Sequence, residues 1–173
     1  MAEWLLAGLL IVATITDIQR QKIYNWTTYP GILLGLALGY FDRGWPGLED
    51  RVLAVALCGG LMLLAFVLLG IGGGDVKLIA MIAAFLGVEQ GVMAMLWTFV
   101  LAACLAGALL IWRIGAWRIV KKTAGHVKAM LTAKTWVPLT ETERQPLERG
   151  LYLAPAALAA VCLVWANEVY GWF

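Results

Sequence analysis

Charge is scarce in this chain, and that scarcity excludes most classes of protein at once. Its 173 residues include 13 basic and 11 acidic side chains, 14% in all, whereas 62% are hydrophobic. A soluble domain is usually about half apolar and about a quarter charged. The composition therefore excludes an ordinary soluble globular protein and a disordered one, and the net charge of +2 is no nucleic-acid-binding footprint. It predicts an integral membrane protein with several helices.

Other features that would point elsewhere are also lacking. The apolar runs do not alternate with polar residues, as the strands of a membrane barrel do. No basic segment opens the chain, where Glu3 stands instead, so a cleavable signal peptide is not expected. Cys58, Cys104 and Cys162 are single residues within apolar runs, and no CxxC pair exists. We therefore expect no metal site and no cofactor.

Six apolar runs bounded by charged or turn residues are the candidate spans. They are Trp4–Ile15, Thr28–Phe41, Val52–Ile71, Val76–Val88, Val92–Ile111 and Leu151–Ala166. A helix needs about 20 residues to cross the hydrocarbon core, so several runs need their polar flanks as well. The sequence predicts an all-α, polytopic integral membrane protein. Its single domain, residues 1–173, has about six transmembrane helices.

The basic residues predict which side of the membrane each loop faces. With six spans, one side receives the loops 19–25, 72–77 and 112–150, which hold all the Lys and Arg residues except Arg43 and Arg51. Basic loops stay on the cytoplasmic side, so both termini are expected outside. Within the long loop 112–150, apolar residues recur at helical spacing among lysines and arginines. This pattern indicates an interfacial cytoplasmic helix, with a solvated connector as the alternative.

Two carboxylates, Asp17 and Asp75, stand where hydrophobicity should exclude them. Both are at the inner ends of spans, and an ionisable group in such a place is a functional candidate. They are expected on the same side and at similar depth, where they can form the acid and base pair of an aspartic protease. The alternative is that Asp75 only caps a helix and that Asp17, near Arg20 and Lys22, is an ordinary charge at the membrane edge.

The residues around Asp75 suggest how a substrate is held. Gly72, Gly73 and Gly74 leave a backbone without side chains, which an extended peptide can approach closely, and Lys77 adds a positive charge. Asp75 should open its helix and Asp17 should close its own. Because the helix dipole favours negative charge only at the start of a helix, we take Asp75 as the base and Asp17 as the proton-bearing partner.

At this point the chain resembles a known family. The stretches DIQRQKIYN (residues 17–25) and GGGDVKLIA (residues 72–80) resemble motifs of the type IV prepilin peptidases, which are membrane aspartic proteases of the GxGD group. The segment 151–155 is similar to the proline-containing start of that family's last helix. The resemblance implies that Asp17 and Asp75 are the catalytic aspartates, without a metal, and that Gly72–Gly74 and Lys77 support them.

The resemblance also implies a substrate and a location. The substrate is a prepilin or pseudopilin helix whose basic leader is removed after a glycine, at the cytoplasmic face of the bacterial inner membrane. Lipid is the other expected partner, nucleic acid is not expected, and a homo-oligomer is left open. Lacking paired zinc-binding cysteines, the chain resembles the small peptidases of tight-adherence (Flp) pili. Archaeal preflagellin peptidases are also similar, and the usual proline before Asn25 is Tyr24 here.

Two other interpretations stay open from the residues alone. One is a proton-coupled small membrane transporter in which Asp17 and Asp75 relay ions. The other is an inactive pilus-assembly subunit, against which the intact Asp17, Asp75 and Lys77 argue. A further pattern, Gly31, Gly35 and Gly39, predicts close helix packing, either within the molecule or at a dimer face.

Overall fold

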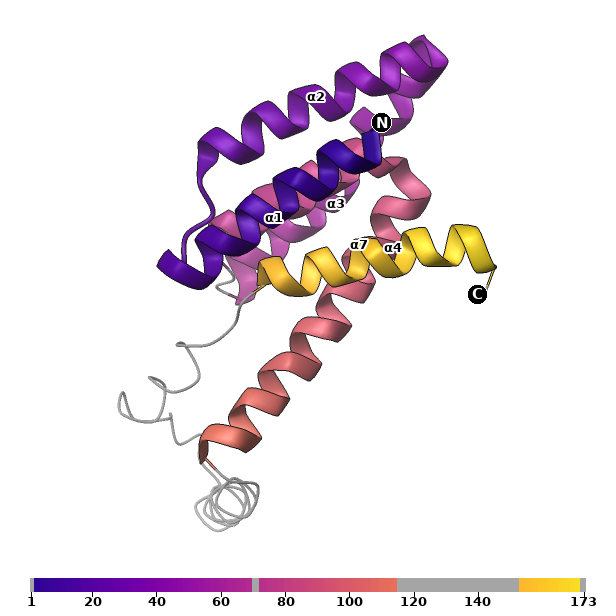
Figure 1. The fold of residues 1–173 in the computed structure, drawn as a ribbon. Coiled ribbons are helices and arrows are strands. Elements are labelled where there is room, and N and C mark those ends of the chain that lie inside the picture. The colour runs from indigo at the N-terminus through magenta and orange to yellow at the C-terminus, as the bar shows by residue number, and fades with distance from the viewer. Residues whose placement is uncertain (1, 70–71, 115–152, 172–173) are drawn as a thin grey trace, which may run out of the picture. The chain divides into compact units, whose positions relative to one another are not determined.

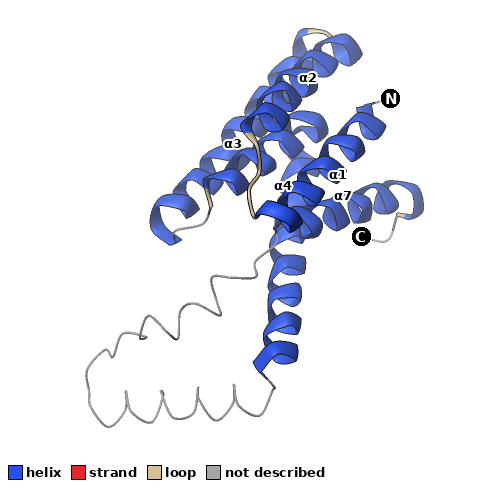
Figure 2. Ribbon diagram, turned by 60° about the vertical axis from the view of Figure 1, so that its left-hand side comes forward, coloured by secondary structure: helices blue, strands red, loops and turns tan. Residues whose placement is uncertain are grey.

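The structure, a computed structural model, describes residues 2–69, 72–114 and 153–171 (Figure 1). Its helices are α1 (Ala2–Arg20), α2 (Asn25–Arg43), α3 (Trp45–Leu69), α4 (Gly73–Ile114) and α7 (Leu153–Tyr170). Within these ranges the chain contains no β-strand, and only short loops join the helices (Figure 2). The predicted all-α fold is confirmed for this part of the chain.

Four helices are long and apolar enough to cross a membrane. They are Ala2–Arg20, Trp45–Leu68, Gly73–Leu109 and Leu153–Tyr170. Helix α2 has 19 residues, as many as α1, but it is not among the four. The structure thus agrees with the prediction of a membrane protein with several helices. The prediction of six spans with both termini outside stays a prediction.

The connections between helices are shorter than the sequence suggests. Residues 21–24 join α1 to α2, and Gly44 alone joins α2 to α3. Gly44 has a φ of 67°, a value that suits glycine, and its N–H donates a hydrogen bond to the carbonyl of Tyr40. Most of the loop predicted over residues 42–51 is therefore helical. The predicted loop is wrong here because charged residues mark loops but also occupy the exposed ends of helices.

Helix α4 contains a sharp break at Gly87. This residue has a φ of 81° and a ψ of −173°, outside the helical region, and the helix continues on both sides of it. A Cβ at Gly87 would meet the carboxylate of Asp50, an exposed side chain that can turn away, so the positive φ is what requires glycine here. The loop predicted at residues 89–91 is wrong, because those residues are helical and the break falls before them.

The chain forms two compact units. One comprises Met1–Leu101 with Tyr152–Phe173, and the other comprises Ala102–Leu151. Every contact discussed below lies in the first unit. The described part of the second unit is residues 102–114, the end of α4. Apart from residues 112–114, the predicted basic loop 112–150 lies outside the described residues, so its interfacial helix and the single domain stay predictions.

The first half of α4 is the core of the first unit. All residues from Leu78 to Phe85 are buried, so this segment is covered by other helices on every side. Helix α1 contributes Leu6, Leu10 and Ala13, which are spaced so that they share one face. Asp17 continues that buried face one turn further on. The face that packs α1 into the core thus also carries its carboxylate inward.

Large apolar side chains cover the outside of α3. Leu61, Leu64, Phe66, Val67 and Leu68 each keep more than two fifths of their surface exposed. An apolar surface of this extent is unfavourable in water but suits a helix that faces lipid. The exposed residues of α3 therefore agree with its apolar length in identifying it as a membrane helix.

The glycine stripe of α2, formed by Gly31, Gly35 and Gly39, packs against other helices of the same molecule. Of the two predicted arrangements, packing within the molecule and packing at a dimer face, the structure shows the first. A Cβ at Gly31 would collide with the side chain of Met81, and one at Gly35 would lie 2.8 Å from the backbone carbonyl of Ala84. A Cβ at Gly39 would collide with Arg51. Without these Cβ atoms α2 lies directly against α4 and α3. The stripe therefore brings α2 against the buried half of α4, whose start carries Asp75.

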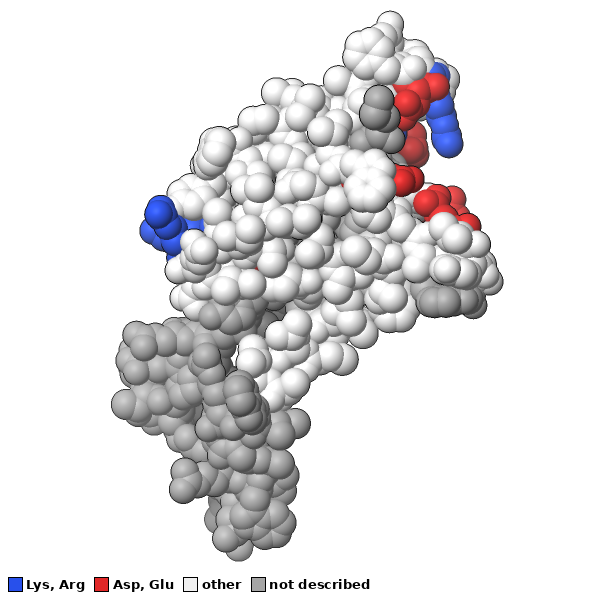
Figure 3. Space-filling model, viewed as in Figure 1, with Lys and Arg blue, Asp and Glu red and all other residues white. Residues whose placement is uncertain are grey.

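Charged side chains gather at the two ends of the described helices and leave an apolar belt between them (Figure 3). Arg20 and Lys22 lie where α1 ends. At the other end Arg51 donates to the carbonyl oxygen of Gly35 at 2.9 Å and pairs with Asp42 at 3.2 Å. This sorting is typical of a membrane protein. Which end faces the cytoplasm stays a prediction.

Candidate active site

Asp17 lies in the last turn of α1 and is buried. Only 7% of its surface is exposed, and its Oδ2 accepts a hydrogen bond of 3.2 Å from the backbone N–H of Ala154. Ala154 is the second residue of α7 and is completely buried. Asp17 is therefore an interior residue between two helices, which rules out an ordinary solvated charge at the membrane edge.

Asp75 lies in the first turn of α4, where the sequence predicts it. The helix begins at Gly73, so Asp75 follows the cap position and does not occupy it. Its backbone N–H donates to the carbonyl of Gly72 at 3.0 Å, and its Oδ2 turns back toward Gly72. The side chain is half-buried. Asp75 is thus held by the start of its own helix.

The structure places the two carboxylates near each other. Asp17 closes α1, Asp75 opens α4, and Gly74 beside Asp75 lies against Ile23 of the α1–α2 connection. Two carboxyl groups that come close enough to interact titrate as a pair and can share one proton. Such a pair can accept a proton from water at one oxygen while donating a proton to a substrate carbonyl from another.

The glycines before Asp75 are placed differently from the prediction. Gly72 is exposed, but Gly73 and Gly74 are already helical, so the loop expected over residues 72–77 is wrong beyond Gly72. A Cβ at Gly74 would lie 3.1 Å from Cβ of Ile23. The absence of a side chain there lets the start of α4 approach the α1–α2 connection. Close packing against Ile23 thus explains Gly74, and an extended substrate strand is not needed to explain it.

Lys77 links α4 to α2. Its Nζ donates a 2.7 Å hydrogen bond to Oδ1 of Asn25, and it lies 5.4 Å from the centre of the Tyr29 ring. Cations are attracted to aromatic rings at this distance. The predicted supporting residue, two positions after Asp75, therefore holds the start of α2 against the start of α4.

Three residues of this region, Asn25, Tyr29 and Ala154, make contacts that the sequence does not predict. Asn25 and Ala154 lie in segments that resemble the family motifs, whereas Tyr29 lies in neither segment. The signal for Asn25 was its position directly after the α1–α2 connection, where a polar side chain can reach a neighbouring helix. No local signal identifies Ala154, because its contribution is a backbone N–H.

Tyr24, where the resemblance to the prepilin peptidases implies a proline, precedes α2. It caps the helix with a φ of −80° and a ψ of 138°, values that proline also adopts. Its carbonyl accepts hydrogen bonds from the N–H groups of Thr27 and Thr28, and its hydroxyl accepts one from Arg20 at 2.9 Å. Tyr24 therefore keeps a backbone suited to the entry into α2 and contacts the end of α1.

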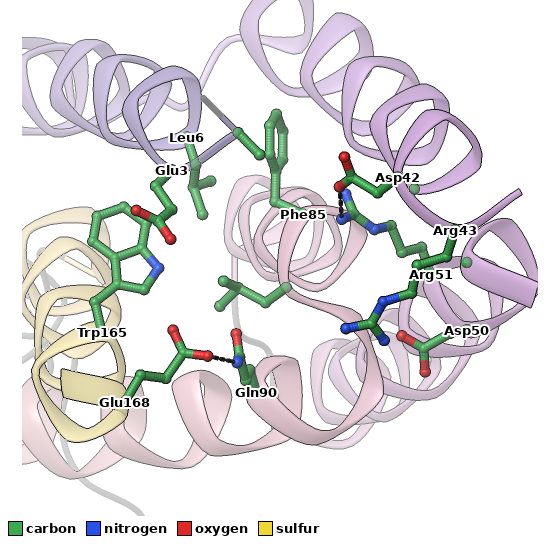
Figure 4. Close-up of a pocket in the computed structure, with 14 residues that line it drawn as sticks. Glu3, Leu6, Asp42, Arg43, Asp50, Arg51, Phe85, Gln90, Trp165 and Glu168 are labelled. Carbon is green, nitrogen blue, oxygen red and sulfur yellow. Dashed lines mark hydrogen bonds and ion pairs between the residues drawn. The ribbon is translucent and has the colours of Figure 1, made fainter. Parts of the chain in front are cut away.

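A cavity of about 280 Å³ lies away from the carboxylate pair, and Figure 4 shows residues that line it. Glu3 lines it, and Glu3 lies about 21 Å from Asp17 along α1 at 1.5 Å per residue. Figure 4 shows Gln90 donating to Glu168 across the floor of the cavity. The acidic side chains that line it are exposed, namely Glu3, Asp42, Asp50 and Glu168. Solvated carboxylates of this kind do not form a dry catalytic site.

Metal ligands do not gather anywhere in residues 2–69, 72–114 and 153–171. No three His, Cys, Asp or Glu side chains of these ranges meet. Cys58 is buried, Cys104 and Cys162 are exposed, and all three are free thiols. The Asp17–Asp75 pair is therefore the one arrangement in the described residues that suits acid–base chemistry.

Comparisons with known proteins show the family of this chain. Residues 4–111, which include Asp17 and Asp75, match the type IV leader peptidase family. The chain is also similar to prepilin peptidase EppA of Methanocaldococcus jannaschii, with 35% identity over 75 residues, or 43% of this chain. The aligned part spans only 20% of that relative. No solved structure matches. Since the family match covers more than half of its residues, the chain belongs to the type IV leader peptidase family.

Proposed function

We propose that this protein is a membrane aspartic endopeptidase that removes the leader peptide of type IV prepilin-like precursors. The observation that carries the proposal is the placement of Asp17 at the end of α1 and of Asp75 at the adjoining start of α4, in a chain of the type IV leader peptidase family. The similarity to a prepilin peptidase supports the substrate class. No metal or cofactor is needed, because the two carboxyl groups supply both proton acceptor and proton donor.

The proposed reaction is general acid–base hydrolysis. One carboxylate takes a proton from water as the water oxygen bonds to the peptide carbonyl carbon, while the other carboxyl group gives its proton to the carbonyl oxygen. The neutral tetrahedral intermediate then collapses. The C–N bond breaks as the first group protonates the leaving nitrogen, and the second group recovers a proton from a hydroxyl. Each group thereby returns to its starting state.

The finer features of the proposal follow from the sequence. Cleavage after a glycine is what the resemblance to the prepilin peptidases implies. A site on the cytoplasmic side of the bacterial inner membrane is supported by the basic residues Arg20 and Lys22, which follow Asp17. The tight-adherence (Flp) subtype is supported by the lack of CxxC pairs. A prepilin has a basic leader followed by an apolar helix, so its cleavage site lies at the membrane edge, at the depth expected of Asp17 and Asp75.

Co-expression with a prepilin tests the proposal. We expect leader removal by the wild type and none by Asp17→Asn or Asp75→Asn, because the amide can neither accept nor donate the required proton. Asp42→Asn is the matched control, since Asp42 is an exposed carboxylate at the other end of the helices. Leader removal is followed on a gel, with the membrane content of each variant measured by immunoblot. Normal removal of the leader by either active-site variant would contradict the proposal.

A further inference from the structure

The start of α7 meets the end of α1 at Asp17. The N–H of Ala154 points to Oδ2 of Asp17 at 3.2 Å, and both residues are buried, with exposed fractions of 0% and 7%. Figure 1 shows the first turn of α7 beside the last turn of α1. The donor is a main-chain group, so its position is fixed by the helix and not by a side-chain rotamer.

This contact changes the electrostatic surroundings of Asp17. At the end of α1 the carboxylate faces the negative end of its own helix dipole, which is unfavourable. The first turn of α7 presents the positive end of a second dipole and an N–H without an intrahelical acceptor. A hydrogen bond between buried groups is strengthened because little water competes with it. Helix α7 thus offsets the disadvantage that the sequence predicts for Asp17.

Pro155 helps to explain why the N–H of Ala154 is the donor to Asp17. It lies in the first turn of α7, where a missing N–H leaves no broken hydrogen bond and where its fixed φ suits the helix. The residue that follows Ala154 therefore offers no competing N–H to the carboxylate. This arrangement also lies outside residues 4–111, the part of the chain that matches the family.

We propose that the first turn of α7 positions the catalytic pair: the N–H of Ala154 holds Oδ2 of Asp17, so that Oδ1 is the oxygen that exchanges a proton. Ala154 is a positioning residue in this scheme, because it acts through Asp17. The proposal rests on the proposed peptidase function for its catalytic meaning. The hydrogen bond itself can be tested without activity.

Replacing one amide by an ester isolates the contact. Incorporation of lactic acid in place of Ala154, by nonsense suppression, removes the N–H and keeps the methyl group and the helix. The loss of a hydrogen bond to a charged group should move one limb of the pH profile of kcat to higher pH by about one unit. If the acidic limb moves, Asp17 is the carboxylate that must be ionised for activity. If the basic limb moves, Asp17 is the group that must be protonated, and Asp75 is the ionised member of the pair.

Two controls separate positioning from folding. The same ester at Ala157 removes an N–H within α7, and Ala154→Gly changes the side chain but keeps the N–H. Both should keep the wild-type pH profile, even if they unfold at a lower temperature. A profile that is unchanged in the Ala154 ester, or equally shifted in the Ala157 ester, overturns the proposal.

Infrared spectroscopy can detect the hydrogen bond between Ala154 and Asp17 without measuring activity. In protein whose aspartates carry ¹³C at the side-chain carboxyl carbon, subtracting the spectrum of Asp17→Asn identifies the bands of Asp17. We expect the Asp17 carboxylate stretch to shift in the Ala154 ester and to stay in place in the Ala157 ester. An identical Asp17 band in all three proteins contradicts the hydrogen bond. Failure of the peptidase proposal is recognised separately, as wild-type protein that leaves prepilin uncut.

Discussion

Lys77 of α4 donates a 2.7 Å hydrogen bond to Asn25, the first residue of α2. The contact joins the two motifs that carry Asp75 and Asp17, since Asn25 ends one motif and Lys77 follows the aspartate of the other. Tyr29, one turn further along α2, lies under the same ammonium group. The start of α2 is thereby held against the start of α4, beside the carboxylate pair.

The Lys77–Asn25 contact should appear as coupling between two substitutions. Lys77→Met and Asn25→Ala each remove the same hydrogen bond, so the double variant should be less destabilised than the sum of the two single variants. We expect a coupling free energy of about 1 kcal/mol. It is measured from thermal unfolding in detergent as a double-mutant cycle. Lys22→Met, which changes an exposed lysine of the α1–α2 connection, is the control and should be additive with Asn25→Ala. Additive effects of Lys77→Met and Asn25→Ala contradict the contact.

The packing of α2 on α4 predicts a strong effect at Gly35. An added Cβ in Gly35→Ala would lie 2.8 Å from the backbone of Ala84, which cannot move without displacing the core of α4. We expect a loss of about 1–3 kcal/mol in the free energy of unfolding, the usual result of overpacking. Gly60→Ala is the matched control, because a Cβ at Gly60 meets nothing within 4 Å. Equal stability of the two variants would show that α2 does not pack on α4 in this way.

Local patterns were sufficient to predict where the aspartates stand on their helices. Apolar runs end at Asp17 and restart after Asp75, and the structure places the first in the last turn of α1 and the second in the first turn of α4. The repeat from Gly31 to Gly39 likewise predicted close packing. These features depend on periodicity along one helix, which a sequence displays directly.

Contacts between distant segments were not predictable in the same way. The N–H of Ala154 is a main-chain group, so no residue type marks it as the partner of Asp17. Gly74 suggested an open loop because glycine disfavours helices, yet tertiary packing against Ile23 overrides that preference. The break in α4 was expected at Glu89, where charge begins, but backbone conformation places it at Gly87.

Gly87 should tolerate alanine poorly because of its backbone conformation. Its φ of 81° is strained for any residue with a Cβ. Gly44 has a φ of 67° and a Cβ there would meet nothing within 4 Å, so Gly44→Ala reports the cost of a positive φ alone. Because the exposed carboxylate of Asp50 can turn away from a Cβ at Gly87, we expect each variant to lose about 1–3 kcal/mol of unfolding free energy, measured by thermal unfolding in detergent. A Gly87→Ala protein as stable as the wild type would contradict the positive φ at Gly87.

The break at Gly87 also decides how many times the chain crosses the membrane. If α4 crosses twice, Val169 near the end of α7 lies on the same side as Arg43 at the end of α2. If α4 crosses once, the two residues lie on opposite sides. Both are exposed, so single cysteines at these positions can be labelled. Cys58, Cys104 and Cys162 are first replaced by alanine to remove background labelling.

We expect a membrane-impermeant maleimide to label Arg43→Cys and Val169→Cys in intact spheroplasts, and Lys22→Cys only after permeabilisation. This pattern follows from six spans with the basic connection at residue 22 inside, because the anionic inner leaflet and the membrane potential retain positive loops on the cytoplasmic side. The Lys22→Cys variant is the control for membrane integrity. Labelling of Val169→Cys only after permeabilisation, with Arg43→Cys still accessible from outside, would mean an odd number of crossings between them and a single crossing by α4. Neither result would separate Asp75 from Asp17, because Asp75 precedes the break in α4 and Lys77 binds Asn25 just after α1.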